Sequence, residues 1–370
     1  MTILRNAKIF ADRLEEKLIY NRRSYSEMKY DHAHVYPYLA PTIKLTADEK
    51  EEVKRLWGDV VPVPLTRGYE FYKGTKALFG FDARFLPSSY YYPYIEGVLN
   101  PERWKKALSH KGMIEVAYSA AVGFPETIVR TFGGVFMDKD YNPMLREEVV
   151  KALNAVDSPV LYKPATDSEQ GNGIRFIRPE EMPPFIEEIK NGSIFNDHAD
   201  FVIQKPLTQT EDTKIFNPTS LNCVRITTIN INGEISVGSA ALKCGPKNSH
   251  VDNIGNGKRG VMVGVDKDGQ LADFGFYGNG EKATAHNGVP FKGHKITAYS
   301  RMVDAAKKLH SYAEACKIIG WDLALDENDN PVLIEGNTIY PGISVEQMCS
   351  GPIFGERTEE VVEYVKKMQK

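Results

Sequence analysis

The chain has 370 residues, of which 42% are hydrophobic and 26% charged, and its formal net charge is -3. This length suffices for two or three packed units, and the composition is ordinary for a globular protein, which argues against disordered and fibrous classes. The small negative charge gives no global electrostatic reason to bind a nucleic-acid backbone or an anionic membrane surface, so a small-molecule or carbohydrate partner fits better.

Two features indicate the cellular compartment. Charged residues interrupt the apolar ones every few positions in residues 1–17, so neither a signal-peptide core nor a membrane span can be drawn there. The cysteines are irregularly spaced, unlike those of a zinc knuckle or a disulfide scaffold, and we expect buried free thiols at Cys223, Cys244, Cys316 and Cys349. The sequence therefore predicts a cytoplasmic protein without membrane insertion.

Residues 1–108 are predicted to be mainly helical. Thr46 and Glu49 form a possible capping box, and Asn100 followed by Pro101 can start another helix. Two tyrosine-rich stretches, residues 32–41 and 88–94, have no clean period and are expected to be loops that pack on the core or contact an acceptor. Apolar residues recur at helical spacing at Ala7, Phe10, Leu14 and Leu18.

From Pro159 onward the sequence changes to short β-rich runs separated by turn signals. A helix from about Thr297 to Ile318 interrupts them, and a last amphipathic helix over residues 361–368 docks the C-terminus. No regular alternation of strand and helix is present, so the sequence predicts an α+β fold with mostly antiparallel strands. The predicted strands cover residues 159–163, 174–177, 200–205, 224–231, 234–242, 260–266, 321–325 and 331–335.

The strongest local signal is a hairpin whose apolar strands are interrupted by carboxylates. If its turn centres on Asn328 and Asp329, Asp322 lies opposite Glu335, and Asn337 projects from the same face. Two carboxylates and an amide oxygen on one patch repel each other unless a cation lies between them, and hard oxygen ligands suit Mg²⁺. The alternative is a solvated hairpin end with incidental acids.

A second segment places Lys163 at the end of a strand, before a small polar loop. Gly171 and Gly173 permit a tight loop whose backbone N–H groups can cover phosphate oxygens, and the lysine supplies a positive charge beside them. No GKS or GKT follows, so this is not a P-loop, and a plain hairpin turn remains an alternative.

Two further strands carry polar residues that can contact a nucleotide. The backbone where the strand over residues 200–205 ends can read an adenine edge, and Glu211 can accept hydrogen bonds from a ribose. An ordinary strand end is the alternative there. Arg225 breaks a β-branched run, and a half-buried arginine needs an anion, which is either a structural carboxylate or a phosphate.

In this order, these segments resemble the ATP-grasp superfamily, and most closely its sugar-transfer-associated branch. The resemblance runs from about Ser109 to Pro341 and implies a fold of two α+β subdomains that grip ATP, preceded by the mainly helical region. It divides the chain into residues 1–108 on the acceptor side, subdomain 1 over 109–203 and subdomain 2 over 204–370. Six motifs carry it, at Gln204–Leu207, Asn222–Arg225, Val251–Asn253, Gly255–Gly260, Gly320–Asp322 and Ile334–Asn337.

The resemblance also implies roles for individual residues, with ATP and Mg²⁺ as cofactors. Asp322, Glu335 and Asn337 match the Mg²⁺ ligands, and Arg225 and Lys163 match positions that act on the transferred phosphoryl group. Nucleotide contacts are implied for Lys111, Lys163, Ser168, Gly171, Gly173, Gln204, Lys205, Pro206, Leu207 and Glu211.

The acceptor side and three departures from the family pattern complete the prediction. Asp252 and Asn253 match acceptor-side positions, and Arg259, where consecutive glycines are more usual, indicates a basic patch for an acidic substrate. Gln204 replaces the usual hinge glutamate, and Glu169 puts an acid in the phosphate loop.

The function implied by the resemblance is ATP-dependent ligation of a carboxylate to an amine through an acyl-phosphate. The substrates would be a sugar acid or amino acid and an amine, in polysaccharide or natural-product biosynthesis. Two alternatives stay open: a kinase that phosphorylates a hydroxyl, and a nucleotide-binding regulator without turnover.

Overall fold

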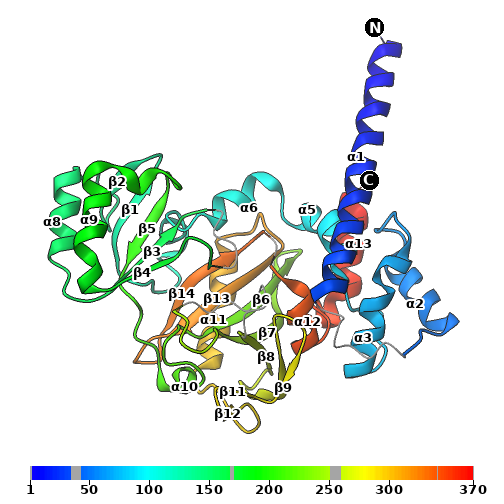
Figure 1. The fold of residues 1–370 in the computed structure, drawn as a ribbon. Coiled ribbons are helices and arrows are strands. Elements are labelled where there is room, and N and C mark those ends of the chain that lie inside the picture. The colour runs from blue at the N-terminus through cyan, green and yellow to red at the C-terminus, as the bar shows by residue number, and fades with distance from the viewer. Residues whose placement is uncertain (1, 35–42, 167–170, 251–259, 340, 370) are drawn as a thin grey trace.

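The computed structural model describes residues 2–34, 43–166, 171–250, 260–339 and 341–369. It confirms a mixed α+β fold with a helical N-terminal region. Two separate sheets follow that region, one of five strands and one of seven, and every pairing between their strands is antiparallel (Figure 1).

The N-terminal region is a set of helices beside the larger sheet. Helix α1 (Thr2–His34) extends well beyond the body of the molecule, and its C-terminal part packs against α4 (Figure 1). The predicted capping box is confirmed, because the hydroxyl of Thr46 accepts from the Glu49 backbone and the Glu49 carboxylate accepts from that of Thr46. The other helices here are α2 (Ala47–Trp57), a 3-10 turn (Leu65–Gly68), α3 (Tyr69–Phe79), α4 (Ser88–Tyr90), α5 (Glu96–Leu99), α6 (Glu102–Ser109) and α7 (Ile114–Tyr118).

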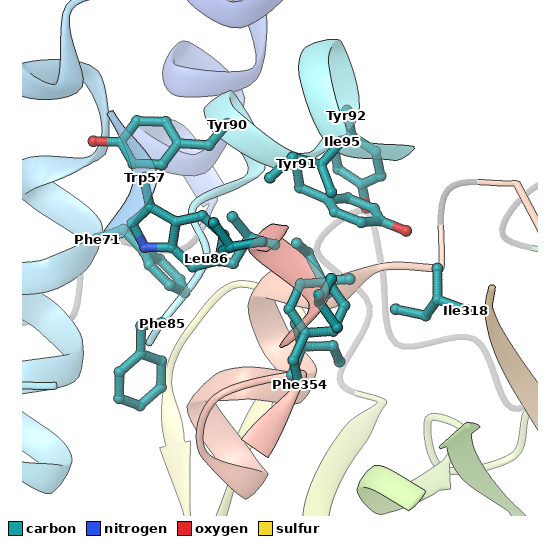
Figure 2. Close-up of a cluster of buried hydrophobic side chains, with 14 of the residues drawn as sticks. Trp57, Phe71, Phe85, Leu86, Tyr90, Tyr91, Tyr92, Ile95, Ile318 and Phe354 are labelled. Atoms are coloured by element: carbon teal, nitrogen blue, oxygen red, sulfur yellow. The ribbon is translucent and has the colours of Figure 1, made fainter. Parts of the chain in front are cut away.

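The second tyrosine-rich stretch is helical, so its prediction as a loop was wrong. Residues 88–94 form α4 and the start of a π-helical segment, Tyr91–Ile95, that leads into α5. All its tyrosines are buried, so its packing on the core is confirmed. Figure 2 shows Tyr90, Tyr91 and Tyr92 around the cluster that also contains Trp57 and Phe354. Most of the first tyrosine-rich stretch lies outside the described residues.

The five-stranded sheet has the order β2-β1-β5-β3-β4 and carries two helices. β1 and β2 form a hairpin that the sequence analysis did not predict, with its turn at Gly133 and Gly134. The side chains of α8 and α9 pack on this sheet around Phe185 and Phe201. The elements are β1 (Thr127–Phe132), β2 (Val135–Met137), α8 (Arg146–Asn154), β3 (Val160–Pro164), β4 (Arg175–Ile177), a 3-10 turn (Pro179–Glu181), α9 (Met182–Asn191), a second 3-10 turn (Ser193–Phe195) and β5 (Phe201–Gln204).

The seven-stranded sheet has the order β10-β9-β8-β7-β6-β13-β14 and forms the centre of the molecule. The short helix α10 (Glu211–Lys214) precedes it, and a two-stranded ribbon of β11 (Ala285–His286) and β12 (Val289–Pro290) lies beside it. Its strands are β6 (Cys223–Ile231), β7 (Glu234–Cys244), β8 (Val261–Val265), β9 (Leu271–Tyr277), β10 (Lys282–Ala283), β13 (Ile318–Leu325) and β14 (Pro331–Asn337).

The two faces of this sheet pack against different helices. Helix α11 (Tyr299–Ser311) covers one face, and α12 (Ile343–Ser350) lies on the other with the N-terminal helices. A 3-10 turn (Gly355–Arg357) leads into α13 (Thr358–Met368), which confirms the predicted last helix. The predicted extension of α11 to Ile318 was wrong, because Ile318 already begins the central strand β13.

The structure bears out the expectation for the cysteines. Cys223, Cys244, Cys316 and Cys349 are all buried free thiols. In the part of the chain that the structure describes, no helix combines the length and the apolar character needed to cross a membrane.

Candidate functional site

The hairpin of β13 and β14 brings Asp322 opposite Glu335, as predicted, but by a different route. A β-bulge follows Asp322, and the strands are joined by the five residues Asp326–Asn330 rather than by a two-residue turn centred on Asn328 and Asp329. The Asp326 carboxylate accepts from the backbone N–H groups of Asn328 and Asn330, which fixes the wider turn. The extra residue of the bulge compensates for the longer turn, so Asp322 still pairs with Glu335 as predicted.

Asp322 is the more enclosed of the two predicted acidic ligands, with 2% of its surface exposed. Its two carboxylate oxygens accept from Arg225 on β6, and Oδ2 also accepts from Nζ of Lys243 on β7 at 2.8 Å. Burial alone would raise the pKa of Asp322, but the guanidinium and the ammonium hold it well below its usual range. Asp322 is therefore a carboxylate at neutral pH.

Glu335 lies nearer to solvent and pairs with a lysine from a distant segment. Its Oε1 is 2.9 Å from Nζ of Lys111, and the side chains are 35% and 12% exposed respectively. Burial would raise the pKa of Glu335, but the ammonium of Lys111 lowers it below the ordinary value. The backbone N–H of Lys111 donates to the Ala165 carbonyl beside β3, so Lys111 links the end of the five-stranded sheet to β14.

Arg225 is held in one orientation by the surrounding backbone. Its Nη1 donates to the carbonyl of Pro341, and its other nitrogens donate to Asp322. A Cβ atom on Gly320, the neighbour on β13, would lie 2.9 Å from Cδ of Arg225, so only glycine leaves room for the guanidinium. Of the two anions that the sequence left open for Arg225, the structure shows the carboxylate, that of Asp322.

Glu346 on α12 stands behind Arg225 and is fully buried. Its Oε1 accepts from the hydroxyls of Thr227 and Ser239, on the same sheet face as Arg225. Burial raises the pKa of Glu346, and the positive charge of Arg225 opposes that rise.

Asn337 donates from Nδ2 to the Gly320 carbonyl at 3.1 Å and to Oδ2 of Asp322 at 3.4 Å. These bonds hold the amide of Asn337 beside the Asp322 side chain and the backbone of β13. The structure therefore brings together Asp322, Glu335 and Asn337 as the sequence predicted, and adds three cations around them.

The predicted nucleotide side contains a chain of hydrogen bonds across the first sheet. Lys163 on β3 donates to Oε1 of Gln204 at 3.1 Å, and Nε2 of Gln204 donates to the hydroxyl of Thr127 on β1 at 3.1 Å. Thr127 then donates to Glu115, which also accepts from the fully buried Arg130. A glutamine suits this place because it must accept from one neighbour and donate to the other, which a carboxylate cannot do.

The residues after Gln204 leave the sheet at the edge of this region. The backbone N–H of Lys205 donates to the Glu126 carbonyl, and its side chain pairs with the Glu126 carboxylate at 2.9 Å. Pro206 and Leu207 are partly buried. Glu211 begins α10 and is 77% exposed, with Lys214 as its ion-pair partner, so its described contacts do not join it to Lys163 or Gln204.

The glycine loop is described only at its C-terminal side. Gly171 and Gly173 have φ angles of 74° and 76°, which favour glycine, so the predicted tight loop needs both residues. Four predicted site residues, Ser168, Asp252, Asn253 and Arg259, lie outside the described residues.

Lys243, Thr127 and Glu346 belong to this region but were missed by the sequence analysis. Lys243 had a readable signal, since it interrupts the apolar run SAALKC just as Arg225 interrupts its own strand. Thr127 and Glu346 carried none, because their partners are far away in the sequence.

The donor set fits Mg²⁺ accompanied by phosphate better than the bare ion. Three acids, Asp322, Glu335 and Glu346, lie among three cations, and both proposed acidic ligands are held in ion pairs. Phosphate oxygens would attract those cations and so leave carboxylate oxygens for the metal. Within the described residues, no group of three His, Cys, Asp or Glu side chains could hold a metal by itself.

Comparison with known proteins identifies the family. The family model described as sugar-transfer associated ATP-grasp matches residues 96–363, which is more than half of the chain. The chain therefore belongs to the sugar-transfer-associated ATP-grasp family, as its motifs indicated. Among curated proteins, no sequence matches significantly.

Solved structures with a similar fold include three enzymes of low sequence identity. The VanG D-Ala:D-Ser ligase of Enterococcus faecalis is 13% identical (TM-score 0.43) over 71% of this chain and 62% of its own. The biotin carboxylase–β-γ-ATP complex from Campylobacter jejuni is 13% identical (TM-score 0.45; 72% and 48%). D-alanyl-alanine synthetase A of Vibrio cholerae is 13% identical (TM-score 0.41; 71% and 66%). This chain thus matches about half to two thirds of each of these proteins.

Proposed function

We propose that the protein is an ATP-dependent ligase that joins a carboxylate to an amine through an acyl-phosphate. The observation that carries this proposal is the ligand face, where Asp322 and Glu335 are surrounded by Arg225, Lys243 and Lys111. Such a face suits a metal-bound polyphosphate, because it offers oxygen ligands to a metal and fixed positive charges to phosphate. Membership of the family and the low-identity likeness to ligases support the same reaction class.

Asp322, Glu335 and Asn337 would hold the metal at this face. Lys111 and Lys243, which now pair with Glu335 and Asp322, would contact phosphate oxygens of the nucleotide. Bound Mg²⁺ would supply neutralisation of the phosphate oxygens. The existing ion pairs keep the carboxylates ionised before the metal arrives, so no proton has to leave them on binding.

Arg225 would stabilise the charge that develops on the transferred phosphoryl group. Its orientation is fixed in advance by Pro341 and by the room left at Gly320. A guanidinium that needs no reorganisation stabilises a transition state better than a mobile one. Lys163 would turn from Gln204 to the nucleotide phosphates.

The acyl transfer itself requires no protein nucleophile. A carboxylate substrate attacks the γ-phosphorus, ADP leaves, and the resulting acyl-phosphate is attacked by an amine with loss of phosphate. The cations around Asp322 then stabilise the tetrahedral oxyanion. We propose a sugar acid or an amino acid as the carboxylate, in the making of a polysaccharide or a natural product.

The division of the chain at residues 108/109 and 203/204 remains part of this proposal. The two sheets support two gripping subdomains, with the nucleotide between Lys163 on the first and Asp322 on the second. Gln204 is the last residue of β5, so the hinge would begin directly at the sheet edge.

Product analysis tests the proposed reaction. The protein is incubated with Mg·ATP, pooled carboxylic acids and hydroxylamine, and we expect ADP and hydroxamate in equal amounts. AMP release would contradict the reaction class. ADP with a stable phosphate ester and no hydroxamate would identify a kinase.

Two arginine variants test the role proposed for Arg225. Arg225→Ala should retain nucleotide affinity and lose turnover. Arg175→Ala is the control, because Arg175 is also a strand arginine with a two-point carboxylate partner, Glu188, but lies in the other sheet. An Arg225 variant impaired only in ATP affinity would contradict the assigned role.

A further inference from the structure

The backbone that carries Lys111 is held by hydrogen bonds to distant segments. The N–H of Lys111 donates to the Ala165 carbonyl beside β3 at 2.9 Å. The carbonyl of the next residue, Gly112, accepts from Nη1 of Arg130 on β1 at 3.3 Å and from the hydroxyl of Tyr141 at 3.1 Å. Three separate parts of the five-stranded sheet and its turns therefore fix the position from which the Lys111 side chain extends.

Arg130 is itself held in one orientation. It is fully buried, which is costly for a permanent charge unless its nitrogens are paired. Its Nη2 donates to the Glu115 carboxylate at 2.5 Å and to the Lys139 carbonyl at 3.3 Å. The guanidinium carbon lies 3.9 Å from the centre of the Tyr141 ring, which is a cation–π contact. These contacts direct Nη1 of Arg130 at the Gly112 carbonyl.

Tyr141 has a backbone conformation that tyrosine rarely adopts. Its φ angle is 66°, in the left-handed region that glycine and asparagine favour. It lies in the turn after β2, where the Asp138 carboxylate accepts from the backbone N–H of Asn142. A bulky residue in the left-handed region is strained, and such strain is found mostly where the side chain has a function. The turn itself does not require a tyrosine, so the ring and the hydroxyl are the useful parts of Tyr141.

A row of stacked rings connects Tyr141 with the residue before Lys111. The ring of Tyr141 stacks on that of Phe132, and Phe132 stacks on His110, with centroids 6.2 Å and 5.4 Å apart. Nδ1 of His110 accepts from the N–H of Gly112 at 3.1 Å. A Cβ atom on Gly112 would lie 3.1 Å from Phe132 and from His110, so this backbone packs closely against the rings.

The ammonium of Lys111 depends on this backbone for its position. Its Nζ is 2.9 Å from Oε1 of Glu335 on the seven-stranded sheet. A lysine has a flexible four-carbon stem, so a fixed backbone helps to bring its charge to one point. A shift of the Gly112 carbonyl would move the ammonium away from Glu335 and from the phosphates that the proposed function assigns to Lys111.

We propose that Arg130 and Tyr141 are positioning residues, which hold Lys111 where its ammonium meets the phosphates of the nucleotide. This inference rests on the proposed function, because it takes Lys111 to be a phosphate contact. Neither residue needs to touch the nucleotide, since both act through the Gly112 carbonyl. If they served only the five-stranded sheet, the effect of their loss would not depend on the side chain of Lys111.

Calorimetric titration with Mg·ADP tests this dependence. Tyr141→Phe removes one oxygen and keeps the ring, so it should lower the affinity for Mg·ADP by roughly 3- to 10-fold, the range for one neutral hydrogen bond. In a Lys111→Met background the same change should have no further effect. Arg130→Met should lower the affinity by more than Tyr141→Phe, and by no more than Lys111→Met. If Arg130→Met does not fold, Tyr141→Phe still decides the question.

Tyr162→Phe is the matched control. Tyr162 lies on β3 of the same sheet, and its ring is also next to an arginine, Arg175, at 5.7 Å. This variant should bind Mg·ADP as the parent does. The proposal is overturned if Tyr141→Phe binds as tightly as the parent, or if it loses the same factor with and without the Lys111 side chain.

Hydrogen exchange of the ligand-free protein separates this inference from the proposed function. The amides of Lys111 and Gly112 should exchange faster in Tyr141→Phe than in the parent, whereas those of α9, on the same sheet, should not change. Unchanged exchange at both amides would overturn the positioning role. A parent that does not bind Mg·ADP would contradict the proposed nucleotide site, and hydrogen exchange would still decide whether Tyr141 fixes the Lys111 backbone.

Discussion

Replacing the two proposed acidic metal ligands should cost very different amounts of stability. Asp322→Asn leaves Arg225 and Lys243 facing a neutral amide, and the side chains of these three residues are 3%, 9% and 11% exposed. Removing one partner of a buried pair costs about 3–5 kcal/mol, since an uncompensated charge remains. Glu335→Gln breaks one pair, to Lys111, and Glu335 is 35% exposed, so about 0–1 kcal/mol is expected.

Urea unfolding of the ligand-free proteins measures this contrast through the shift in midpoint at constant slope. Both variants should lose turnover with Mg·ATP. The double variant Asp322→Asn with Lys243→Met should recover part of the lost stability, because one of the stranded charges is gone. Equal destabilisation by the two single variants would refute the reasoning, as would a double variant less stable than Asp322→Asn.

Three further predictions concern neighbouring features. Gly320→Ala should abolish turnover and cost about 1–3 kcal/mol by urea unfolding, because its Cβ would lie 2.9 Å from Cδ of Arg225. Burial raises the pKa of Asp31 to about 7. The contribution of Asp31 to the free energy of unfolding is therefore complete below the ordinary pKa of an aspartate and is lost as pH rises to about 7, on the order of 4 kcal/mol. Asp31→Asn should flatten the pH dependence of the free energy of unfolding between these two pH values. Trp57→Ala should cost about 3–5 kcal/mol by the same assay, since the ring is fully buried and donates to the Ala83 carbonyl at 2.7 Å.

The parts of the fold that could be predicted are those with a local pattern. The pairing of Asp322 with Glu335 follows from two apolar runs around one turn. The helix capping box of Thr46 and Glu49 follows from a four-residue motif. The unpredicted hairpin of β1 and β2 also had a local signal, Gly133 with Gly134 between β-prone runs. Its first strand, β1, contains the buried Arg130. This arginine can be buried because it forms an ion pair with Glu115, and the sequence of β1 alone does not indicate that pair.

The rest depends on contacts between distant segments. Tyrosines and Pro93 favour a loop over residues 88–94, yet packing against the larger sheet and α12 makes this stretch helical and buried. In the candidate site, Lys111 meets Glu335 only after the chain has folded. Periodicity therefore indicated which strand carries the acids, but not which cations neutralise them.

The segment that leaves β14 bears on how proteins of this family can diversify. Thr338 donates to the Lys105 carbonyl, and Gly342 and Ser344 contact the N-terminal helices, while Pro341 holds Arg225. Thr338, Pro341, Gly342 and Ser344 therefore form an attachment site on the seven-stranded sheet for a separate helical module, the N-terminal region. Evolution can exchange or remodel that module to suit a new substrate while leaving the strand that bears Glu335 and Asn337 untouched.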